Sequence, residues 1–215
     1  MVFRDRADAG RRLAEALRKY GGRRDVTVVA LPRGGVVLGR IVADALGAPL
    51  DIVVPRKIGS PGNEEYAIGA ITESGHAVWN EAERALADES YIERTVSAEQ
   101  AEARRRIDTY RAGLPPRDLK GRTVVVVDDG IATGYTMRAA VETVKSEGPA
   151  KVVAAVPVAP PDSAKEIGGL VDESVVLSKP SPFWAIGAFY EEFGQVEDGE
   201  VVRLLEPERN KATSH

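Results

Sequence analysis

Short apolar runs alternate with amphipathic segments along most of this chain of 215 residues. Runs rich in Val, Ile, Leu and Ala predict buried strands at residues 26–31, 50–54, 124–127 and 152–158, with an edge strand at 173–177. Helices are predicted over residues 4–20, 36–46, 137–144, 161–168 and 197–205. This alternation favours an α/β fold, an open and mainly parallel twisted sheet flanked by helices.

The strand at residues 124–127 ends in two adjacent acids, Asp128 and Asp129, and a loop with two glycines follows. Backbone amides of this loop and the positive end of the next helix converge on one point, which suits a phosphate. A phosphate site alone would not favour two adjacent negative charges, so the acids need hydrogen-bond donors of their own. The 2- and 3-hydroxyls of a ribose 5-phosphate are such donors. An acidic strand end with an ordinary turn is the alternative. The expected phosphate-binding residues are Gly130, Ile131, Ala132, Thr133, Gly134, Tyr135 and Thr136.

A second strand, at residues 26–31, also runs into a glycine loop and a helix. The loop consists of Pro32, Arg33, Gly34 and Gly35. An arginine fork beside a helix N-terminus suits phosphate oxygens, although these four residues alone favour a structural turn. Arg56 and Lys57 follow the next strand, at the sheet edge where ligands of open α/β sheets collect. A solvated basic pair is the alternative for these two residues.

The middle of the chain has a different character. Residues 59–65 are rich in glycine and polar residues and predict a mobile loop, either a lid or an ordinary connection. Residues 66–72 and 77–79 predict a strand pair, with His76 as a surface residue near its turn. Charges of both signs alternate over residues 81–111, which predicts one or two solvated helices rather than a nucleic-acid surface.

Aromatic residues gather towards the C-terminus, at Phe183, Trp184, Phe189 and Tyr190. They are candidates for a surface that stacks on a ring, and core packing is the alternative. We interpret residues 1–215 as one domain, in which residues 81–113 form a helical insertion and residues 178–206 a hood and C-terminal helix. The last few residues are expected to be disordered.

Composition narrows the classes of function. The formal net charge of −4 gives no overall basic field for nucleic acid. The absence of cysteine excludes disulfides and thiol chemistry, and two histidines cannot build a histidine metal site. No apolar run approaches the length of a membrane span, and no signal pattern is present. We therefore expect a soluble, cytoplasmic protein that binds small molecules and neither nucleic acid nor membrane. The sequence does not decide whether it forms a homodimer.

Residues 124–136 resemble the phosphoribosyl pyrophosphate signature of type I phosphoribosyltransferases: an apolar strand, two acids, a short loop, Thr-Gly and a further Thr. The chain lacks the GxxxxGK[ST] and GxGxxG motifs of other nucleotide-binding proteins. The resemblance implies Mg²⁺ as cofactor and phosphoribosyl pyrophosphate as co-substrate, with Asp128, Asp129 and Arg33 as catalytic groups. It also implies that the two acids contact the metal only indirectly, through ribose hydroxyls or water, and that the bond between Pro32 and Arg33 is cis.

The resemblance carries further residue assignments. The pyrophosphate site is expected at Pro32, Arg33, Gly34, Gly35, Arg56 and Lys57, and a hood over the acceptor at Phe183, Trp184, Phe189 and Tyr190. Residues 59–65 take the place of the family's lid. In members that use 6-oxopurines an aspartate of the phosphate loop faces the base, where this sequence has Ala132, so no such proton shuttle is expected.

The expected activity is transfer of ribose 5-phosphate to a nitrogenous acceptor, in nucleotide metabolism, with release of pyrophosphate. A sensor that binds phosphoribosyl pyrophosphate without chemistry is the alternative. Such regulators usually carry a DNA-binding domain, and none is recognisable in this sequence. A nucleotide-activated hydrolase has less support, because no nucleophile stands out.

Overall fold

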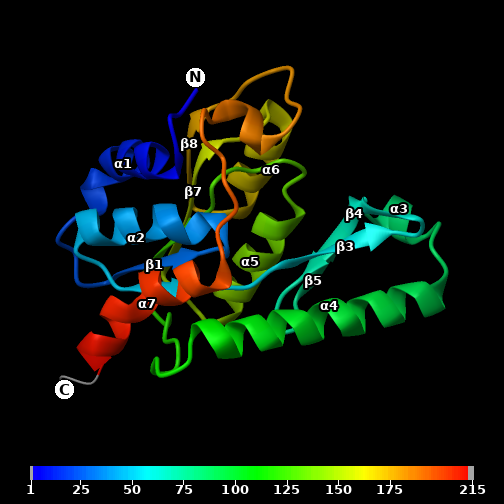
Figure 1. The fold of residues 1–215 in the computed structure, drawn as a ribbon, viewed down its shortest axis with the longest axis horizontal. Helices are drawn as coiled ribbons and strands as arrows, with labels where there is room; N and C mark the ends of the chain where they lie inside the picture. Colours follow the sequence, from blue (N-terminus) through cyan, green and yellow to red (C-terminus); the bar gives the residue numbers. More distant parts are fainter. Residues whose placement is uncertain (1, 213–215) are drawn as a thin grey trace.

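The computed structural model describes the backbone of residues 2–212 and confirms the predicted α/β fold (Figure 1). The central sheet has five strands in the order β2-β1-β6-β7-β8, and every neighbouring pair is parallel. These strands are β1 (Val26–Ala30), β2 (Leu50–Ile52), β6 (Thr123–Val127), β7 (Lys151–Val158) and β8 (Glu173–Ser178). As predicted, β8 is an edge strand, and the apolar runs of β1 and β6 are buried along their whole length.

Helices cover both faces of this sheet, and two apolar clusters form the core. On one face lie α1 (Arg6–Ala16), α2 (Gly34–Leu46) and α7 (Asp198–Ala212), and on the other α5 (Tyr135–Ser146) and α6 (Pro161–Leu170). Short 3₁₀ helices lie at η1 (Arg18–Tyr20) and η2 (Ile186–Phe189). The side chain of Asp5 caps α1 by accepting the N–H of Asp8, and Gly47 ends α2 with φ of 66°.

Residues 56–110 form an arm that projects from the sheet (Figure 1). The arm contains an antiparallel sheet of β3 (Arg56–Ser60), β4 (Asn63–Ile71) and β5 (Ala77–Trp79). Two helices accompany it, α3 (Glu81–Arg84) and α4 (Glu89–Tyr110). The arm has an apolar cluster of its own, in which Ile58, Ile68 and Ile71 pack against Ile92 of α4. The helices predicted over residues 81–111 are therefore present, and they support a hairpin.

The prediction of a loop at residues 59–65 is wrong, because these residues form a β-hairpin. Gly59 and Ser60 belong to β3, Asn63 begins β4, and only Pro61 and Gly62 form the turn between them. Gly62 has φ of 78°, which a tight turn requires. Packing of the hairpin on α4 outweighs the low strand propensity of this segment. For the same reason Arg56 and Lys57 lie in β3 and not in a loop after β2.

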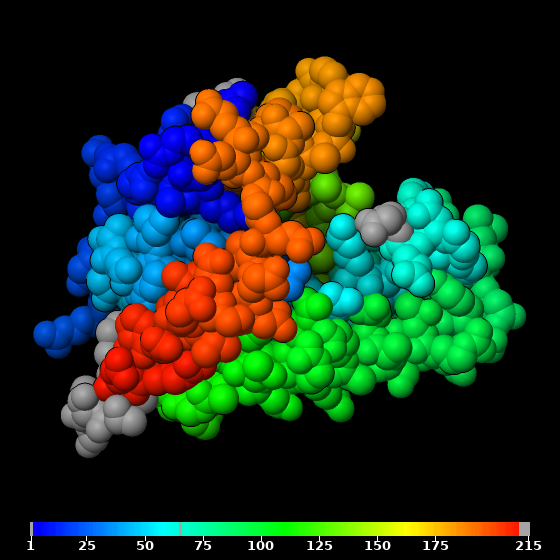
Figure 2. Space-filling model, viewed as in Figure 1, coloured from blue at the N-terminus to red at the C-terminus, as the bar shows by residue number. Residues whose placement is uncertain are grey.

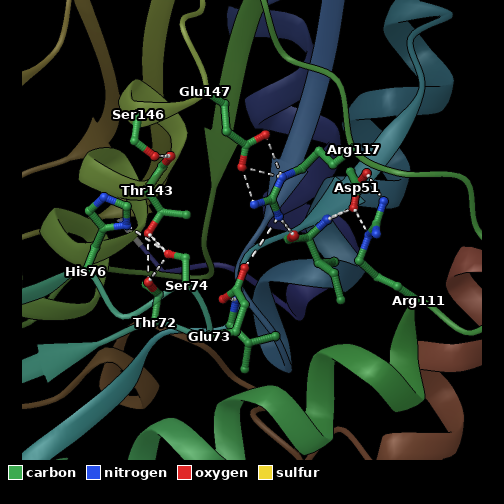
Figure 3. A network of polar contacts seen from close by, with 12 residues as sticks. Asp51, Thr72, Glu73, Ser74, His76, Arg111, Arg117, Thr143, Ser146 and Glu147 are labelled. Carbon is green, nitrogen blue, oxygen red and sulfur yellow. Dashed lines mark hydrogen bonds and ion pairs between the residues drawn. The ribbon is translucent and has the colours of Figure 1, made fainter.

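The arm joins the core through a network of polar side chains (Figure 3). Arg117 forms an ion pair with Glu147 at the end of α5 and lies 3.5 Å from a carboxylate oxygen of Glu73, in the turn between β4 and β5. Nearby, the hydroxyls of Thr72 and Thr143 are 2.8 Å apart. The network fixes the base of the arm relative to the sheet. His76, the expected surface residue, is partly buried there, with Nδ1 2.8 Å from Oγ of Ser74.

The last few residues were expected to be disordered. Residues 213–215 lie outside the described part of the chain, so this expectation stays untested there. Within residues 2–212, no helix is both long enough and apolar enough to span a lipid bilayer.

Candidate functional site

The two glycine loops lie side by side because the strands before them are neighbours. β1 and β6 pair in parallel, with Ala30 opposite Val127, so both loops leave the same edge of the sheet. The backbone N–H of Leu31 donates to the carbonyl of Val127 at 3.0 Å. The structure therefore brings residues 32–35 against the acid pair.

Gly34 and Gly35 are required for this close approach. A β-carbon at Gly34 would lie 2.0 Å from Oδ2 of Asp129, and one at Gly35 would lie 2.9 Å from Oδ1 of Asp128. Atoms that are not bonded to each other need about 3.5 Å, so no larger residue fits without moving the acids. The peptide bond between Pro32 and Arg33 is cis, as predicted.

Asp128 faces a cavity of about 200 Å³. From its own loop the cavity is also lined by Gly130, Ala132, Thr133, Gly134 and Thr136. Pro32, Lys57 and Ile186 of the hood also line it. One cavity thus collects an acid, the glycine loop and a cation that the sequence had indicated separately.

The environment of Asp128 favours ligands that donate hydrogen bonds. Burial raises the pKa of Asp128 well above its usual range, and the charge of Asp129 raises it further, whereas Arg6 and Lys57 act in the opposite direction. Oδ1 of Asp128 accepts the backbone N–H of Asp129 at 2.8 Å. A buried acid in this state is stabilised by hydroxyl donors or cations brought by a ligand.

Asp129 has different surroundings and does not line the cavity. Its carboxylate accepts a hydrogen bond from Nε of Arg6 at 2.7 Å, and the two side chains are only 12% and 13% exposed. Its backbone carbonyl accepts the hydroxyl of Tyr190 at 2.6 Å. Burial raises the pKa of Asp129, and the charge of Arg6 lowers it. The structure therefore places the two acids side by side but engages them differently.

The glycine loop between β6 and α5 is held in place by hydrogen bonds to β7 and α6. The N–H of Ile131 donates to the carbonyl of Val158 at 2.9 Å, and Oγ of Ser163 donates to the carbonyl of Ala132 at 2.7 Å. Gly134, with φ of 86°, precedes α5, and no side chain caps the helix. The first amides of α5 are thus left for a ligand. Ile131 is buried, and Tyr135 lies beneath the guanidinium of Arg138.

The three predicted cations, Arg33, Arg56 and Lys57, have different positions relative to the cavity of Asp128. Lys57 lines the cavity of Asp128 and also a larger cleft of about 860 Å³. Arg56 lines only the larger cleft and forms an ion pair with Glu99 of α4 at 2.7 Å. Arg33 points to the start of α7, where its Nη1 lies 3.5 Å from Oδ1 of Asp198. Of the three, Lys57 is therefore the one that lines the same cavity as Asp128 and the glycine loop.

The larger cleft lies between the arm and the core, and its lining contains no hood residue. Figure 2 shows a hollow of the surface between the orange hood and the cyan part of the arm. The larger cleft shares Pro32, Pro55, Lys57 and Thr136 with the smaller cavity. Its outer wall is α4, which contributes Tyr91, Arg94, Thr95, Ala98, Glu99 and Arg106. Sequence reasoning missed these residues, because mixed charges on a long helix are typical of a solvated face.

The predicted hood residues do not act as one surface. Tyr190 is buried and packs against Phe3 and Phe193, with ring centroids 5.5 and 4.9 Å apart. Phe183 and Phe189 stack on each other at 5.1 Å, and Trp184 is 84% exposed. Ile186, which no aromatic pattern indicates, is the hood residue that lines the cavity.

The donor atoms fit a magnesium ion that arrives with its ligand. Among the side chains that the structure describes, there is no cluster of three or more His, Cys, Asp or Glu residues that could hold a metal. Mg²⁺ usually keeps several waters and binds through one or two carboxylates plus substrate phosphates. Asp128 on the cavity wall would contact such an ion only indirectly, through water or the sugar hydroxyls.

The fold and the site can now be compared with known protein families. A family model described as the phosphoribosyl transferase domain matches residues 3–189. The chain belongs to this family, and the resemblance read from residues 124–136 is confirmed.

Similar proteins agree with this assignment. Two Mycobacterium tuberculosis proteins, MT0597 and Rv0571c, provisionally named phosphoribosyl transferases, are each 42% identical over 207 residues. The match covers 95% of this chain and 46% of each relative, so the chain spans about half of their length. The crystal structure of TT1426 from Thermus thermophilus is 47% identical and superposes with a TM-score of 0.79 over 95% of this chain and 98% of that one.

Proposed function

We propose that this chain transfers the ribose 5-phosphate group of phosphoribosyl pyrophosphate to a nitrogenous acceptor and releases pyrophosphate. One observation carries the proposal: a single cavity is lined by Asp128, by the glycine loop before α5 and by Lys57. A phosphate fits the loop, and the sugar hydroxyls fit the acid. Family membership and the names of the relatives support the same reaction class.

In the proposed reaction the bond from C1 of the ribose to the diphosphate oxygen breaks, and a bond from C1 to the acceptor nitrogen forms. The acceptor loses a proton, and the diphosphate leaves with the electron pair of the broken bond. The sugar ring becomes more positive on the way, and the carboxylate of Asp128 stabilises this charge. Lys57 and Arg56 stabilise the departing diphosphate, and Arg33 joins them only if its side chain turns away from Asp198. Mg²⁺, when bound with the substrate, neutralises further charge on the diphosphate oxygens.

The acceptor we favour is a nucleobase. The larger cleft adjoins the cavity of Asp128 and gives the acceptor room to approach the sugar. Ala132 lines the cavity without a carboxylate, so the chain offers no proton shuttle to a 6-oxopurine at this position. Among bases, those that need no such shuttle are therefore the first candidates.

Calorimetric titration with phosphoribosyl pyrophosphate and Mg²⁺ tests the binding step, and a pyrophosphate-release screen across nucleobases and simple amines tests transfer. Asp128→Asn is expected to raise the activation barrier by about 2–4 kcal/mol and therefore to lower turnover roughly 30- to 1000-fold. Asp108→Asn is the matched control, because Asp108 is exposed on α4. Binding without release from any acceptor indicates the sensor instead, and no binding by the wild-type protein refutes the proposal.

A further inference from the structure

Arg33 is expected to bind the diphosphate, but its side chain lines neither the cavity of Asp128 nor the larger cleft. Its Nη1 instead lies 3.5 Å from Oδ1 of Asp198, the first residue of α7. The two side chains are 31% and 40% exposed. Ion pairs as long and as exposed as this one are weak, so the guanidinium of Arg33 can leave Asp198 readily.

Asp198 has other partners besides Arg33. Its Oδ1 also accepts the hydroxyl of Tyr110, the fully buried last residue of α4, at 2.6 Å. Its Oδ2 lies 3.9 Å from Nη2 of Arg105. The hydrogen bond from Tyr110 holds the pKa of Asp198 below its usual value, although burial raises it. The charges of Arg106 and Arg33 lower this pKa further. The carboxylate of Asp198 therefore stays charged and keeps partners when Arg33 moves away.

The place expected for the diphosphate lies close to this ion pair. Pro32, the residue before Arg33, lines both the cavity of Asp128 and the larger cleft, as does Lys57. Arg106 lines the larger cleft from α4, and its charge acts on Asp198. A diphosphate carries more charge than one carboxylate and offers two oxygens to an arginine fork. A diphosphate in the cleft can thus draw Arg33 away from Asp198.

We propose that Asp198 is a positioning residue that keeps the guanidinium of Arg33 beside the cleft and releases it to the diphosphate. Tyr110 sets the strength of this contact, because its hydroxyl and Arg33 share Oδ1 of Asp198. Helix α7 packs against α2, which follows Arg33, and against α4, which ends at Tyr110 (Figure 1). The contact therefore connects the loop of residues 32–35 to the end of the arm. The proposal rests on the proposed function, but the ion pair belongs to the free protein.

Calorimetric titration with inorganic pyrophosphate and Mg²⁺ tests the proposal with two variants of opposite expected effect. Asp198→Asn removes the charge but keeps an acceptor for the Tyr110 hydroxyl, so it frees Arg33 and should strengthen binding about threefold. Tyr110→Phe leaves Asp198 to the arginines and should weaken binding about threefold. Mere damage to the structure would weaken binding in both. Glu197→Gln is the matched control, because it removes the same charge from an exposed position just before α7, and it should leave binding unchanged.

Two further measurements separate release of Arg33 from a general change of charge. Phenylglyoxal reacts with guanidinium groups, and peptide mass spectrometry of the free protein should show Arg33 reacting about threefold faster in Asp198→Asn and more slowly in Tyr110→Phe. In the background of Arg33→Met, Asp198→Asn should no longer change the affinity for pyrophosphate. Urea unfolding of each variant establishes that it is folded.

The outcomes distinguish this inference from the proposed function. If the wild type binds phosphoribosyl pyrophosphate but Asp198→Asn binds pyrophosphate no more tightly than the wild type, the inference is overturned and the proposed function stands. An effect of Asp198→Asn that persists in the background of Arg33→Met also overturns the inference. If the wild type binds neither pyrophosphate nor phosphoribosyl pyrophosphate, both are refuted, whatever the rates of modification.

Discussion

Replacing Gly35 with alanine tests whether the close approach of the two loops is required. A β-carbon at Gly35 would lie 2.9 Å from Oδ1 of Asp128, 3.0 Å from its Cα and 3.0 Å from the carbonyl oxygen of Val127. Two of these are backbone atoms at the end of a buried strand, so they cannot rotate away. Overpacking of this kind costs about 1–3 kcal/mol.

The helix propensity of alanine acts in the opposite direction. Gly35 lies in the first turn of α2 and its φ is not positive, so alanine alone would gain up to about 1 kcal/mol. We therefore expect a net loss of up to about 2 kcal/mol in the free energy of unfolding, or a fall in Tm of several degrees. Because the contact displaces Asp128, affinity for phosphoribosyl pyrophosphate with Mg²⁺ should also fall at least tenfold.

Gly169→Ala is the matched control. Gly169 also lies in a helix, α6, but its β-carbon would meet nothing within 4 Å. We expect it to stabilise the protein by about 0.5–1 kcal/mol without changing affinity. Urea unfolding and calorimetric titration of both variants provide the measurements. If Gly35→Ala is as stable as Gly169→Ala and binds like the wild type, the reasoning about loop contact is wrong.

Three further predictions concern other parts of the chain. Ser163→Ala removes the hydrogen bond of 2.7 Å to the carbonyl of Ala132 and should cost about 0.5–1.5 kcal/mol in urea unfolding, with weaker affinity for the phosphorylated sugar; Ser181→Ala, in an exposed turn, should change neither. Arg117→Met leaves Glu147 and Glu73 without their common cation at the base of the arm, and should cost about 3–5 kcal/mol in the same assay; a change below 1 kcal/mol would show that the network does not anchor the arm. Burial raises the pKa of Glu173, but Lys19, Tyr20 and Lys151 outweigh burial and lower it to about 2 from 4.5. Glu173 therefore contributes stability that is fully present above pH 4.5 and is lost as the pH falls towards 2. With solvent screening, this contribution should be about 1–2 kcal/mol. The steepness of the fall should be reduced in Glu173→Gln, and an unchanged pH profile of unfolding would contradict this assignment.

The strands and helices of the core could be predicted from the sequence because each has a strong local signal. The runs at residues 124–127 and 152–158 are apolar throughout, as expected for strands buried on both faces. The side chain of Asp5 begins α1, and the left-handed backbone of Gly47 ends α2, so both boundaries depend on neighbouring residues only. The acid pair and the glycine loop directly follow the strand at residues 124–127. Their shared position at the carboxyl end of this strand could therefore be predicted without knowing the rest of the sheet.

Contacts between distant segments account for the predictions that failed. The turn residues at 59–65 predict a loop, but Ile58 and Ile68 bury themselves against Ile92 and turn the segment into a hairpin. The hood itself stays a prediction, but its aromatics divide between a buried ring, a stacked pair and an exposed Trp184. The local sequence does not specify this division; the buried Tyr190, for example, packs against Phe3. The sequence does not distinguish Arg6 from Arg4, Arg11 and Arg12 nearby, although only Arg6 pairs with Asp129.

By itself, the sequence determined the sheet, its helices and the chemistry at the end of β6, since these depend on residues that are close neighbours along the chain. Only the tertiary structure decided which acid faces the cavity, which cation stands beside it and what encloses the cleft. Those choices depend on burial and on charge pairs between segments up to 123 residues apart, such as Arg6 and Asp129. A local pattern carries no information on such pairs, because their energy arises only when folding removes both groups from water.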